Sequence, residues 1–334
     1  MSDTAAARAR KRGVLACLAA GAIWGGIFVG PRMLPQFDAP TFSLARYLCF
    51  GLLSAVLFGW GRRGALVPGS AGATSEGRPS LRDMAMAAWL GLIGNLLYFI
   101  ALVTAIQRTG IAYASLIVGL LPVTTTLAAD WMERRSGAQP FAAHRLLWPL
   151  AVIAAGVAAV NADLFVSSPA TPALGLGAIA VGIVAAFLAL AAWTVYAVHN
   201  TRYLRAHPHL GVGGWATLQG IGTLFWVGIA WLLWTVLAAS GGAEPPQIGS
   251  ALNSPVFLGW ILFLGFGASW LGTALWNFGS RALPATLSGQ MIVFETVFGL
   301  LYGFLFEWRL PHPLEAAGIV LLLAGVVWAV RRHG

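Results

Sequence analysis

Charged residues are scarce in this sequence. Asp, Glu, Lys and Arg make up 9% of the 334 residues, whereas soluble chains carry about 25%. Hydrophobic residues make up 58%, and almost nothing remains outside long apolar runs. The composition therefore excludes a soluble protein and a separate globular domain.

The sequence also lacks the residue clusters of an enzyme or a metal site. Its two cysteines, Cys17 and Cys49, lie within apolar runs, where we expect them to pack as small apolar side chains. No HExxH or GxSxG motif occurs, and the histidines fall in loops or at helix ends: His144, His199, His207, His209, His312 and His333. An intramembrane hydrolase needs a nucleophile with a base, or metal ligands, at one depth. We therefore expect no catalytic residues, metal or cofactor.

Long apolar runs dominate what is present. A bilayer core about 30 Å thick requires about 20 residues of helix. The runs that meet or approach this length are 13–34, 41–60, 84–105, 112–132, 146–162, 174–199, 214–239, 256–278, 285–306 and 314–330. The first run is longer than the apolar region of a signal peptide and lacks a clear cleavage site. We predict an all-α integral membrane protein with ten transmembrane helices.

The basic residues indicate an orientation. The net charge of +9 could suggest a nucleic-acid partner, but Lys and Arg also hold loops of a multi-pass protein on the cytoplasmic side. If the N-terminus is cytoplasmic, 16 of the 20 Lys and Arg residues fall on that side, and the exceptions are Arg32, Arg46, Arg108 and Arg309. We expect both termini in the cytoplasm, lipids as neighbours and no nucleic acid.

An internal repeat is suggested by the layout of the runs. A shift of 174 residues places 90–135 over 264–309 with seven identical positions, which is little above chance for so apolar a sequence. The order of helices and turns, which is similar in the two halves, supports a repeat better than the sequence identity does. We predict two five-helix repeats, 1–162 and 174–334, joined by a linker over 163–173. Since each repeat has an odd number of spans, the two must be inverted, as in many transporters. The alternative is that any ten-helix protein divides into five and five.

Glu295 is the only acidic or basic residue of the run 285–306 and lies near its middle. A carboxylate at bilayer depth costs several kcal/mol, about 2.5 to 3.5 on insertion scales, unless it is protonated or faces a cavity. We consider two interpretations. Glu295 either exchanges a proton during transport, or is a permanently neutral carboxyl bonded to Gln290 or to an indole.

Other polar and aromatic residues in the runs are candidates to face a substrate. Arg46 either lies at the outer mouth of a cavity, where it attracts a carboxylate, or snorkels to the headgroups. Aromatic rings suit apolar or aromatic ligands, and sparse amides orient a polar end, although each ring could equally pack between helices. The candidate substrate-binding residues are Trp24, Phe28, Arg46, Asn95, Tyr98, Trp193, Tyr196, Trp276, Asn277, Gln290, Phe294 and Glu295.

Three local features of the runs give structural expectations. Gly21 and Gly25 should let another helix approach the first one closely. Pro122 should break the hydrogen-bond ladder of the run 112–132, and a short turn over 107–110 should precede that run. Several tryptophans of the run 214–239 are expected to anchor it at the membrane interface.

The sequence resembles the drug/metabolite transporter superfamily, in its ten-helix EamA-type branch, over nearly its whole length. The residues that carry this resemblance are Ile23-Trp24-Gly25, Arg46, Leu121-Pro122-Val123, Glu307 and Ala324-Gly325-Val326. Trp193-x-x-Tyr196 and Trp276-Asn277-x-Gly279 further resemble the YddG-type amino-acid exporters. One departure is Glu295-Thr296-Val297, where the family often has an acid followed by Pro-Val.

The resemblance implies export of small metabolites, amino acids with aromatic or apolar side chains among them, by alternating access across the cytoplasmic membrane. The implied partners are a small-molecule substrate and membrane lipids, with protons as a further candidate. The alternatives are an exporter of drugs or other metabolites with the same fold, and a passive channel.

Overall fold

The computed structural model describes residues 3–29, 33–34, 36–37, 39–59, 79–135, 147–167, 176–242 and 247–332. Regular structure within these residues is helical throughout. In the first half the elements are α1 (Asp3–Gly25), the 3₁₀ turn η1 (Gly26–Phe28), α3 (Ala39–Gly59), α4 (Leu81–Gly91), the π-helix η2 (Leu92–Leu97), α5 (Tyr98–Val118), α6 (Leu121–Arg135) and α7 (Leu147–Ser167). In the second half they are α8 (Leu176–Ala206), α9 (Val212–Ala239), α10 (Ile248–Ala251), α11 (Pro255–Leu262), the π-helix η4 (Phe263–Leu271), α12 (Gly272–Ala282), α13 (Ala285–Met291), α14 (Val293–Glu307) and α15 (Pro313–Arg332).

Six helical stretches of the described chain are long and apolar enough to cross a bilayer. They are Thr41–Gly59, Leu81–Ile106, Leu176–Ala206, Val212–Ala239, Pro255–Ala282 and Leu287–Phe306. Two shorter apolar helices cover Leu147–Val160 and Pro313–Trp328. These stretches coincide with eight of the predicted runs, which confirms a multi-pass helical protein. The ten-helix arrangement in two repeats stays a prediction.

The region around Pro122 differs from the prediction. The turn expected over 107–110 is wrong, because α5 is helical from Tyr98 to Val118. The chain turns instead at Gly119 and Leu120, directly before α6. Pro122 occupies the second residue of α6, in the first helical turn, where its missing N–H costs no hydrogen bond. The interruption expected from Pro122 is therefore present, but it lies just before the proline.

The helix predicted over 146–162 also ends later than expected. The helix expected to end at residue 162 continues as α7 to Ser167, so 163–167 are helical rather than part of the linker. The remainder of the predicted linker, 168–173, lies outside the described residues.

Glycines bring α1 into close contact with α14, as the sequence predicts. A Cβ atom on Gly21 would lie 3.2 Å from the backbone nitrogen of Glu295, and one on Gly25 would lie 2.6 Å from that of Gly299. Real Cβ atoms are not found as close as the second distance, so a side chain at Gly25 would push the helices apart. This contact fixes the depth of Glu295 relative to α1.

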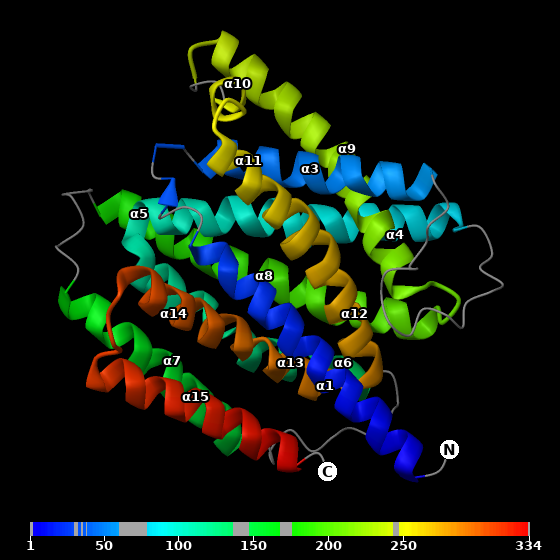
Figure 1. Cartoon of the computed structure of the whole chain (residues 1–334), viewed down its shortest axis with the longest axis vertical. Helices are drawn as coiled ribbons and strands as arrows, with labels where there is room; N and C mark the ends of the chain where they lie inside the picture. Colours follow the sequence, from blue (N-terminus) through cyan, green and yellow to red (C-terminus); the bar gives the residue numbers. More distant parts are fainter. Residues whose placement is uncertain are drawn as a thin grey trace.

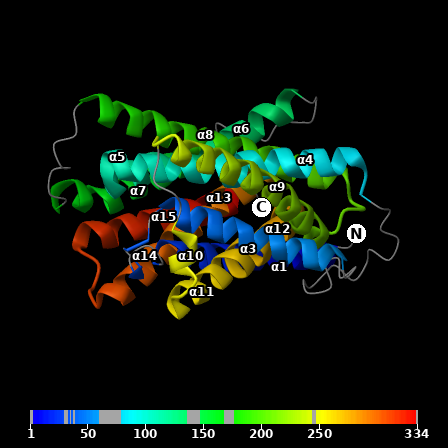
Figure 2. The same cartoon turned by 90° about the horizontal axis from the view of Figure 1, so that it is seen from above.

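Glycines also allow α7 and α15 to approach each other closely. A Cβ atom on Gly156 would lie 2.9 Å from the carbonyl oxygen of Gly318, and one on Gly318 would lie 2.8 Å from that of Gly156. The two helices run side by side at the lower left of Figure 1. Figure 2 shows α4, α5, α6 and α8 on one side of the molecule, and α1, α3, α11 and α14 on the other.

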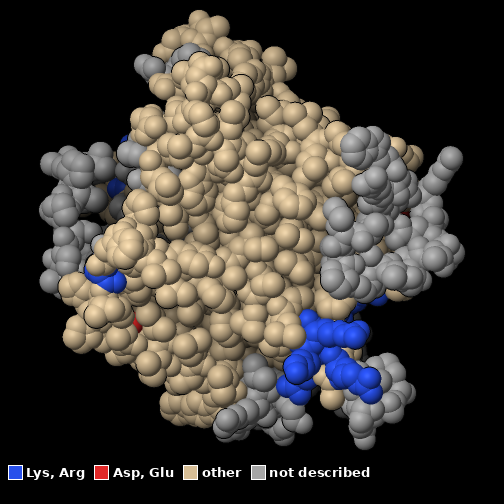
Figure 3. Space-filling model, in the orientation of Figure 1, with Lys and Arg blue, Asp and Glu red and all other residues tan. Residues whose placement is uncertain are grey.

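Charged side chains are sparse on the face shown in Figure 3. Lys and Arg gather at its lower right, over the start of α1, and most of the visible surface carries no charge. Lys11 and Arg12 are exposed in this part of α1. A wide uncharged surface with basic residues at one end is what a bilayer-spanning protein requires.

The two π-helical segments occupy equivalent positions in the chain. A shift of 174 residues carries Leu97, the last residue of η2, onto Leu271, the last residue of η4. The same shift carries Val118, where α5 ends, onto Ile292, the residue between α13 and α14. Such interruptions of the α-helical ladder are often found at functional sites.

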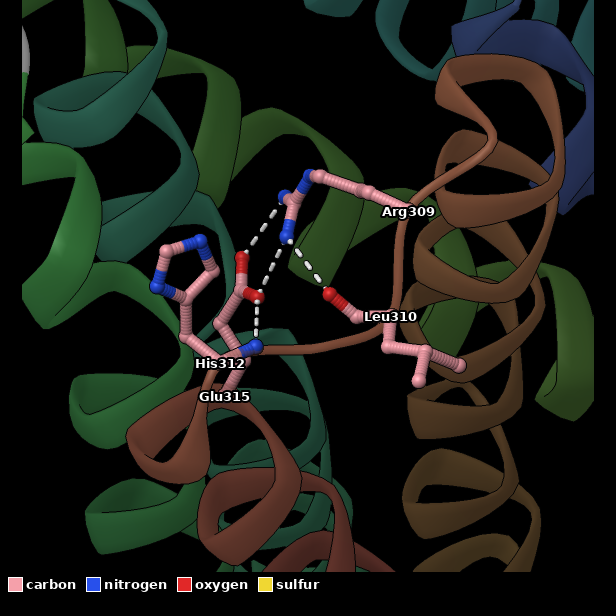
Figure 4. Close-up of polar contacts among 4 residues, drawn as sticks. All are labelled: Arg309, Leu310, His312 and Glu315. Carbon is pink, nitrogen blue, oxygen red and sulfur yellow. Dashed lines mark hydrogen bonds and ion pairs between the residues drawn. The ribbon is translucent and has the colours of Figure 1, made fainter.

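The turn between α14 and α15 is held by an ion pair (Figure 4). The Arg309 guanidinium donates to both carboxylate oxygens of Glu315, at 2.7 and 2.9 Å. Glu315 is 3% exposed and also accepts a hydrogen bond from the backbone N–H of His312, at 2.8 Å. Because His312 directly precedes α15, this carboxylate closes half of a capping box at the helix start.

Candidate functional site

Three tryptophans from three helices meet inside the molecule, and we call Trp24, Trp193 and Trp276 the tryptophan cluster. The ring centroids are 6.1 Å apart for Trp24 and Trp193, 5.6 Å for Trp24 and Trp276, and 5.9 Å for Trp193 and Trp276. Each ring is at most 8% exposed. Since the rings come from α1, α8 and α12, the cluster joins segments that lie far apart in the sequence.

Two tyrosines border the tryptophan cluster through Trp193. The Tyr98 ring lies 6.4 Å from that of Trp193, and the Tyr196 ring lies 5.8 Å from it. Trp193 and Tyr196 are three residues apart on α8, so they project from the same face of the helix. The sequence prediction therefore grouped five aromatic residues that do lie together.

Trp24 and Arg46 are hydrogen-bonded to neighbouring residues of the π-helix η4. The Trp24 indole N–H donates to the carbonyl oxygen of Ala268 at 2.7 Å. The Nε of Arg46 donates to the hydroxyl of Ser269, the next residue, at 3.0 Å. A Cβ atom on Gly272 would lie 2.5 Å from the Trp24 indole nitrogen, so a glycine is needed where the indole approaches.

Arg46 points into the protein. Its side chain is 8% exposed, and its guanidinium carbon lies 5.1 Å from the Tyr47 ring centroid and 5.5 Å from that of Phe99. Aromatic faces attract a guanidinium, more strongly when water is excluded. This burial differs from the exposure of a side chain that snorkels, and contact with a substrate stays a prediction.

Glu295 is partly buried, and its backbone nitrogen lies against α1 at Gly21. A bond between Glu295 and Gln290, one form of the neutral-carboxyl interpretation, is not present among the described residues. Both polar atoms of the Gln290 amide and the indole nitrogen of Trp276 lack a hydrogen-bond partner among the described residues.

A buried network of polar side chains adjoins the tryptophan cluster. The amide oxygen of Asn200 accepts hydrogen bonds from Trp215, at 2.7 Å, and from Gln219, at 2.6 Å. The amide nitrogen of Asn200 donates to Asn277 at 2.7 Å, and Gln219 accepts from the Tyr196 hydroxyl at 3.2 Å. This network ties α8, α9 and α12 together directly beside Trp276.

The sequence did not single out this network. Trp215 belongs to the tryptophans of which several were expected to anchor the membrane interface, yet it is fully buried and bonded to Asn200. Trp231, from the same helix, is 38% exposed, as an interface anchor would be. One available signal was that Asn200 follows Trp193 by seven residues, which places both on one face of α8.

The remaining predicted residues are distributed around the cluster. Asn95 lies in η2 and donates to the Thr223 hydroxyl of α9 at 2.8 Å, so its amide nitrogen serves a contact between helices. Phe294 packs its Cβ against Gly21. The side chain of Phe28 lies outside the described residues. The described residues hold no group of three or more His, Cys, Asp or Glu that could bind a metal ion.

These features define a class of protein. Apolar helices long enough to span a bilayer surround buried aromatic and polar side chains, and interruptions of the α-helical ladder lie close to them. This is the arrangement of an integral membrane protein that handles a small molecule within the membrane.

Comparison with known proteins identifies the family. Residues 11–138 match the EamA-like transporter family. The chain is 35% identical to the inner membrane protein YtfF of Escherichia coli (strain K12), over 96% of this chain and 95% of that protein. It is also 40% identical over 52 residues to an uncharacterized transporter of Haemophilus influenzae, covering 16% of this chain and 30% of that protein. The chain belongs to the EamA-like transporter family and is a membrane transporter.

A solved structure agrees with the fold. A protein crystal structure with 17% sequence identity superposes with a TM-score of 0.67 and covers 96% of both chains. At this identity the likeness describes the arrangement of the helices alone.

Proposed function

We propose that this transporter exports small metabolites, amino acids with aromatic or apolar side chains among them, across the inner membrane by alternating access. Two findings support the location and the class: the chain belongs to the EamA-like transporter family, and a relative that it matches over almost its whole length is named an inner membrane protein. The resemblance of Trp193-x-x-Tyr196 and Trp276-Asn277-x-Gly279 to YddG-type exporters supports the substrate class.

The observation that carries the proposal is a set of buried polar atoms on α12 and α13 that have no hydrogen-bond partner among the described residues. They are the indole nitrogen of Trp276, the amide nitrogen of Asn277 and both amide atoms of Gln290. Most buried polar atoms in proteins are hydrogen-bonded, so an unpaired set needs an explanation. A substrate that places an apolar group on the rings and polar groups on these amides provides one.

Alternating access follows from two inverted repeats. The equivalent positions of η2 and η4, and of the breaks at Val118 and Ile292, support this arrangement. In inverted-repeat transporters the substrate lies where the repeats meet, next to interrupted helices. The basic residues gathered at the start of α1 support cytoplasmic termini (Figure 3).

The test is a screen of labelled amino acids in proteoliposomes that contain the purified protein. We expect saturable counterflow of aromatic and large apolar amino acids, which a passive channel does not produce. Counterflow of other metabolites or drugs, without any amino acid, would move the assignment to the alternative substrate class. Uptake that never saturates would favour a channel.

Protons are the second ligand to test. A buried carboxyl can release and take up a proton as the site faces each side in turn, and Glu295 is the carboxyl of the predicted span 285–306. If Glu295 performs this exchange, a pH gradient drives export by the wild type, and the Glu295→Gln variant retains counterflow but loses the response to the gradient. Wild-type pH dependence in the variant would contradict a proton role.

A further inference from the structure

The buried polar network between α8, α9 and α12 contains one group that can only donate a hydrogen bond. The indole N–H of Trp215 has no acceptor capacity, whereas each amide of the network carries both a donor and an acceptor. Trp215 is fully buried and donates to the amide oxygen of Asn200 at 2.7 Å. Because two donors cannot share this bond, the indole fixes which side of the Asn200 amide faces it.

The orientation of Asn200 in turn sets that of Asn277. With its oxygen on Trp215, Asn200 presents its amide nitrogen to the amide oxygen of Asn277, at 2.7 Å. The bond from Gln219 to the Asn200 oxygen, at 2.6 Å, has the same polarity. Asn277 therefore accepts within the network, and its own NH₂ group is left over as a donor.

The other members of the network can work in either direction. An amide can turn over and exchange its donor and acceptor, and a hydroxyl can donate or accept. Without the indole, Asn200 and Gln219 can turn together, and the bond between Gln219 and the Tyr196 hydroxyl, at 3.2 Å, can reverse with them. The single direction of the network thus depends on Trp215.

The network ends in a donor without a partner. Asn277 is 0% exposed, and its buried amide nitrogen has no hydrogen-bond partner among the described residues. The same holds for the indole nitrogen of the preceding residue, Trp276, which is also a donor. Buried donors are normally hydrogen-bonded, so this part of α12 calls for an acceptor. The Gln290 amide lacks partners on both atoms, and no bond to a described residue gives it a direction.

We propose that Trp215 is a positioning residue that makes Asn277 a fixed hydrogen-bond donor to the substrate. The transporter then selects substrates that place an acceptor, such as a carboxylate oxygen, at Asn277. In an amino acid this acceptor is the carboxylate. The proposal rests on the proposed function and specifies the polar group that the site recognises. Trp215 does not contact the substrate and acts through Asn200.

The experiment compares two ligands of similar shape and opposite polarity. Both 3-phenylpropionate and 3-phenylpropylamine carry a phenyl group on a three-carbon chain, but the first ends in an acceptor and the second in a donor. Their affinities are measured by titration calorimetry in detergent. The wild type should bind the propionate at least about tenfold more tightly, since a hydrogen bond to a charged group is worth about that factor.

Two variants test the direction of the network. Trp215→Phe frees the amides to turn, so the amine should bind more tightly than it does to the wild type, and the preference for the propionate should fall by about threefold to tenfold. Loss of packing alone does not improve the binding of one ligand. Asn277→Asp still accepts from Asn200 but places an oxygen where the NH₂ group was, so the order of the two ligands should reverse.

The matched control is Trp270→Phe. The Trp270 ring is 1% exposed, and its indole N–H donates to the Thr217 hydroxyl at 3.0 Å. The substitution removes a buried indole N–H of the same kind, but its partner is a hydroxyl that can turn without reorienting any amide. Its ratio of affinities for the two ligands should equal that of the wild type.

The outcomes separate this proposal from the proposed function, which counterflow of phenylalanine in proteoliposomes tests. If phenylalanine shows counterflow but the wild type binds the amine as tightly as the propionate, the donor assignment is overturned and the transport function stands. If the ligand order and its reversal appear in binding without any counterflow, the assignment stands and the transport function fails. Equal ratios in Trp215→Phe and Trp270→Phe overturn the role of Trp215. If Trp215→Phe does not fold, Asn277→Asp decides, and the wild-type order in that variant overturns the assignment.

Discussion

Two combinations of an arginine and a glutamate in this chain differ in whether the two side chains bond to each other. We call the bonded pair closed and the other open. In the turn between α14 and α15, both Glu315 oxygens accept from Arg309, and one also accepts from a backbone N–H (Figure 4). Arg46 of α3 donates to the Ser269 hydroxyl, and no hydrogen bond or ion pair joins it to Glu295 of α14 in the described residues. Both oxygens of the Glu315 carboxylate are therefore bonded, whereas the bond from Arg46 to a described residue uses one guanidinium nitrogen, its Nε.

The difference indicates what each pair does. A closed pair that also caps a helix fixes a turn, and its removal leaves buried groups unsatisfied. An open pair inside the protein stabilises little, because each charge has lost water without gaining its partner. We therefore expect changes at the closed pair to act on stability, and changes at the open pair to act on binding.

The largest effect on stability within this comparison is expected for Glu315→Ala. The substitution removes the partner of Arg309 and the acceptor for the His312 N–H, and should lower the free energy of unfolding by about 1–3 kcal/mol. Denaturant titration in detergent, followed by far-UV circular dichroism, measures this loss. Glu315→Gln keeps an acceptor for His312 and should lose less. An unfolding midpoint unchanged in both variants would show that the turn does not depend on this pair.

A smaller effect, on binding, is expected for Trp193→Leu. Trp193 contacts four other aromatic rings, and the loss of an aromatic pair costs about 0.5–1.5 kcal/mol, which corresponds to about threefold to tenfold in affinity for phenylalanine. Trp193→Phe keeps a ring and should lose less. The control is Trp231→Leu on α9, which is 38% exposed and should bind as the wild type does. Equal losses at both positions would mean that the cluster is no more than packing.

The helices could be predicted because the bilayer imposes one length on apolar runs. Trp24, Trp193 and Trp276 were predicted to face a substrate because aromatic rings suit apolar ligands, and no contact between their helices was predicted. The exact ends of the helices were harder to predict from the sequence. The helix α5 continues past residue 107 because nothing before Pro122 interrupts its hydrogen-bond ladder, and glycine and threonine alone do not end a helix packed against neighbours.

The partners of the site residues could not be predicted, because they lie far away in the sequence. Ser269 is 223 residues from Arg46, and Thr223 is 128 residues from Asn95. Their contacts depend on how helices rotate about their axes, which apolar periodicity leaves undefined when a helix is hydrophobic on every side. Trp215 shows the same limit, since an interface tryptophan and a buried one look alike in the sequence.

The smallest effect is expected on the stability of the Arg46→Gln variant. Removal of the charge loses one hydrogen bond to Ser269 and two contacts with aromatic rings, but it also relieves the cost of burying a guanidinium without a paired carboxylate. These contributions oppose one another, so the free energy of unfolding should change by less than about 1 kcal/mol. The same denaturant titration as for Glu315→Ala measures it, with Arg309→Gln as the matched loss of an arginine. If Arg46→Gln destabilises the protein as much as Arg309→Gln does, both pairs are structural and the distinction between an open and a closed pair fails.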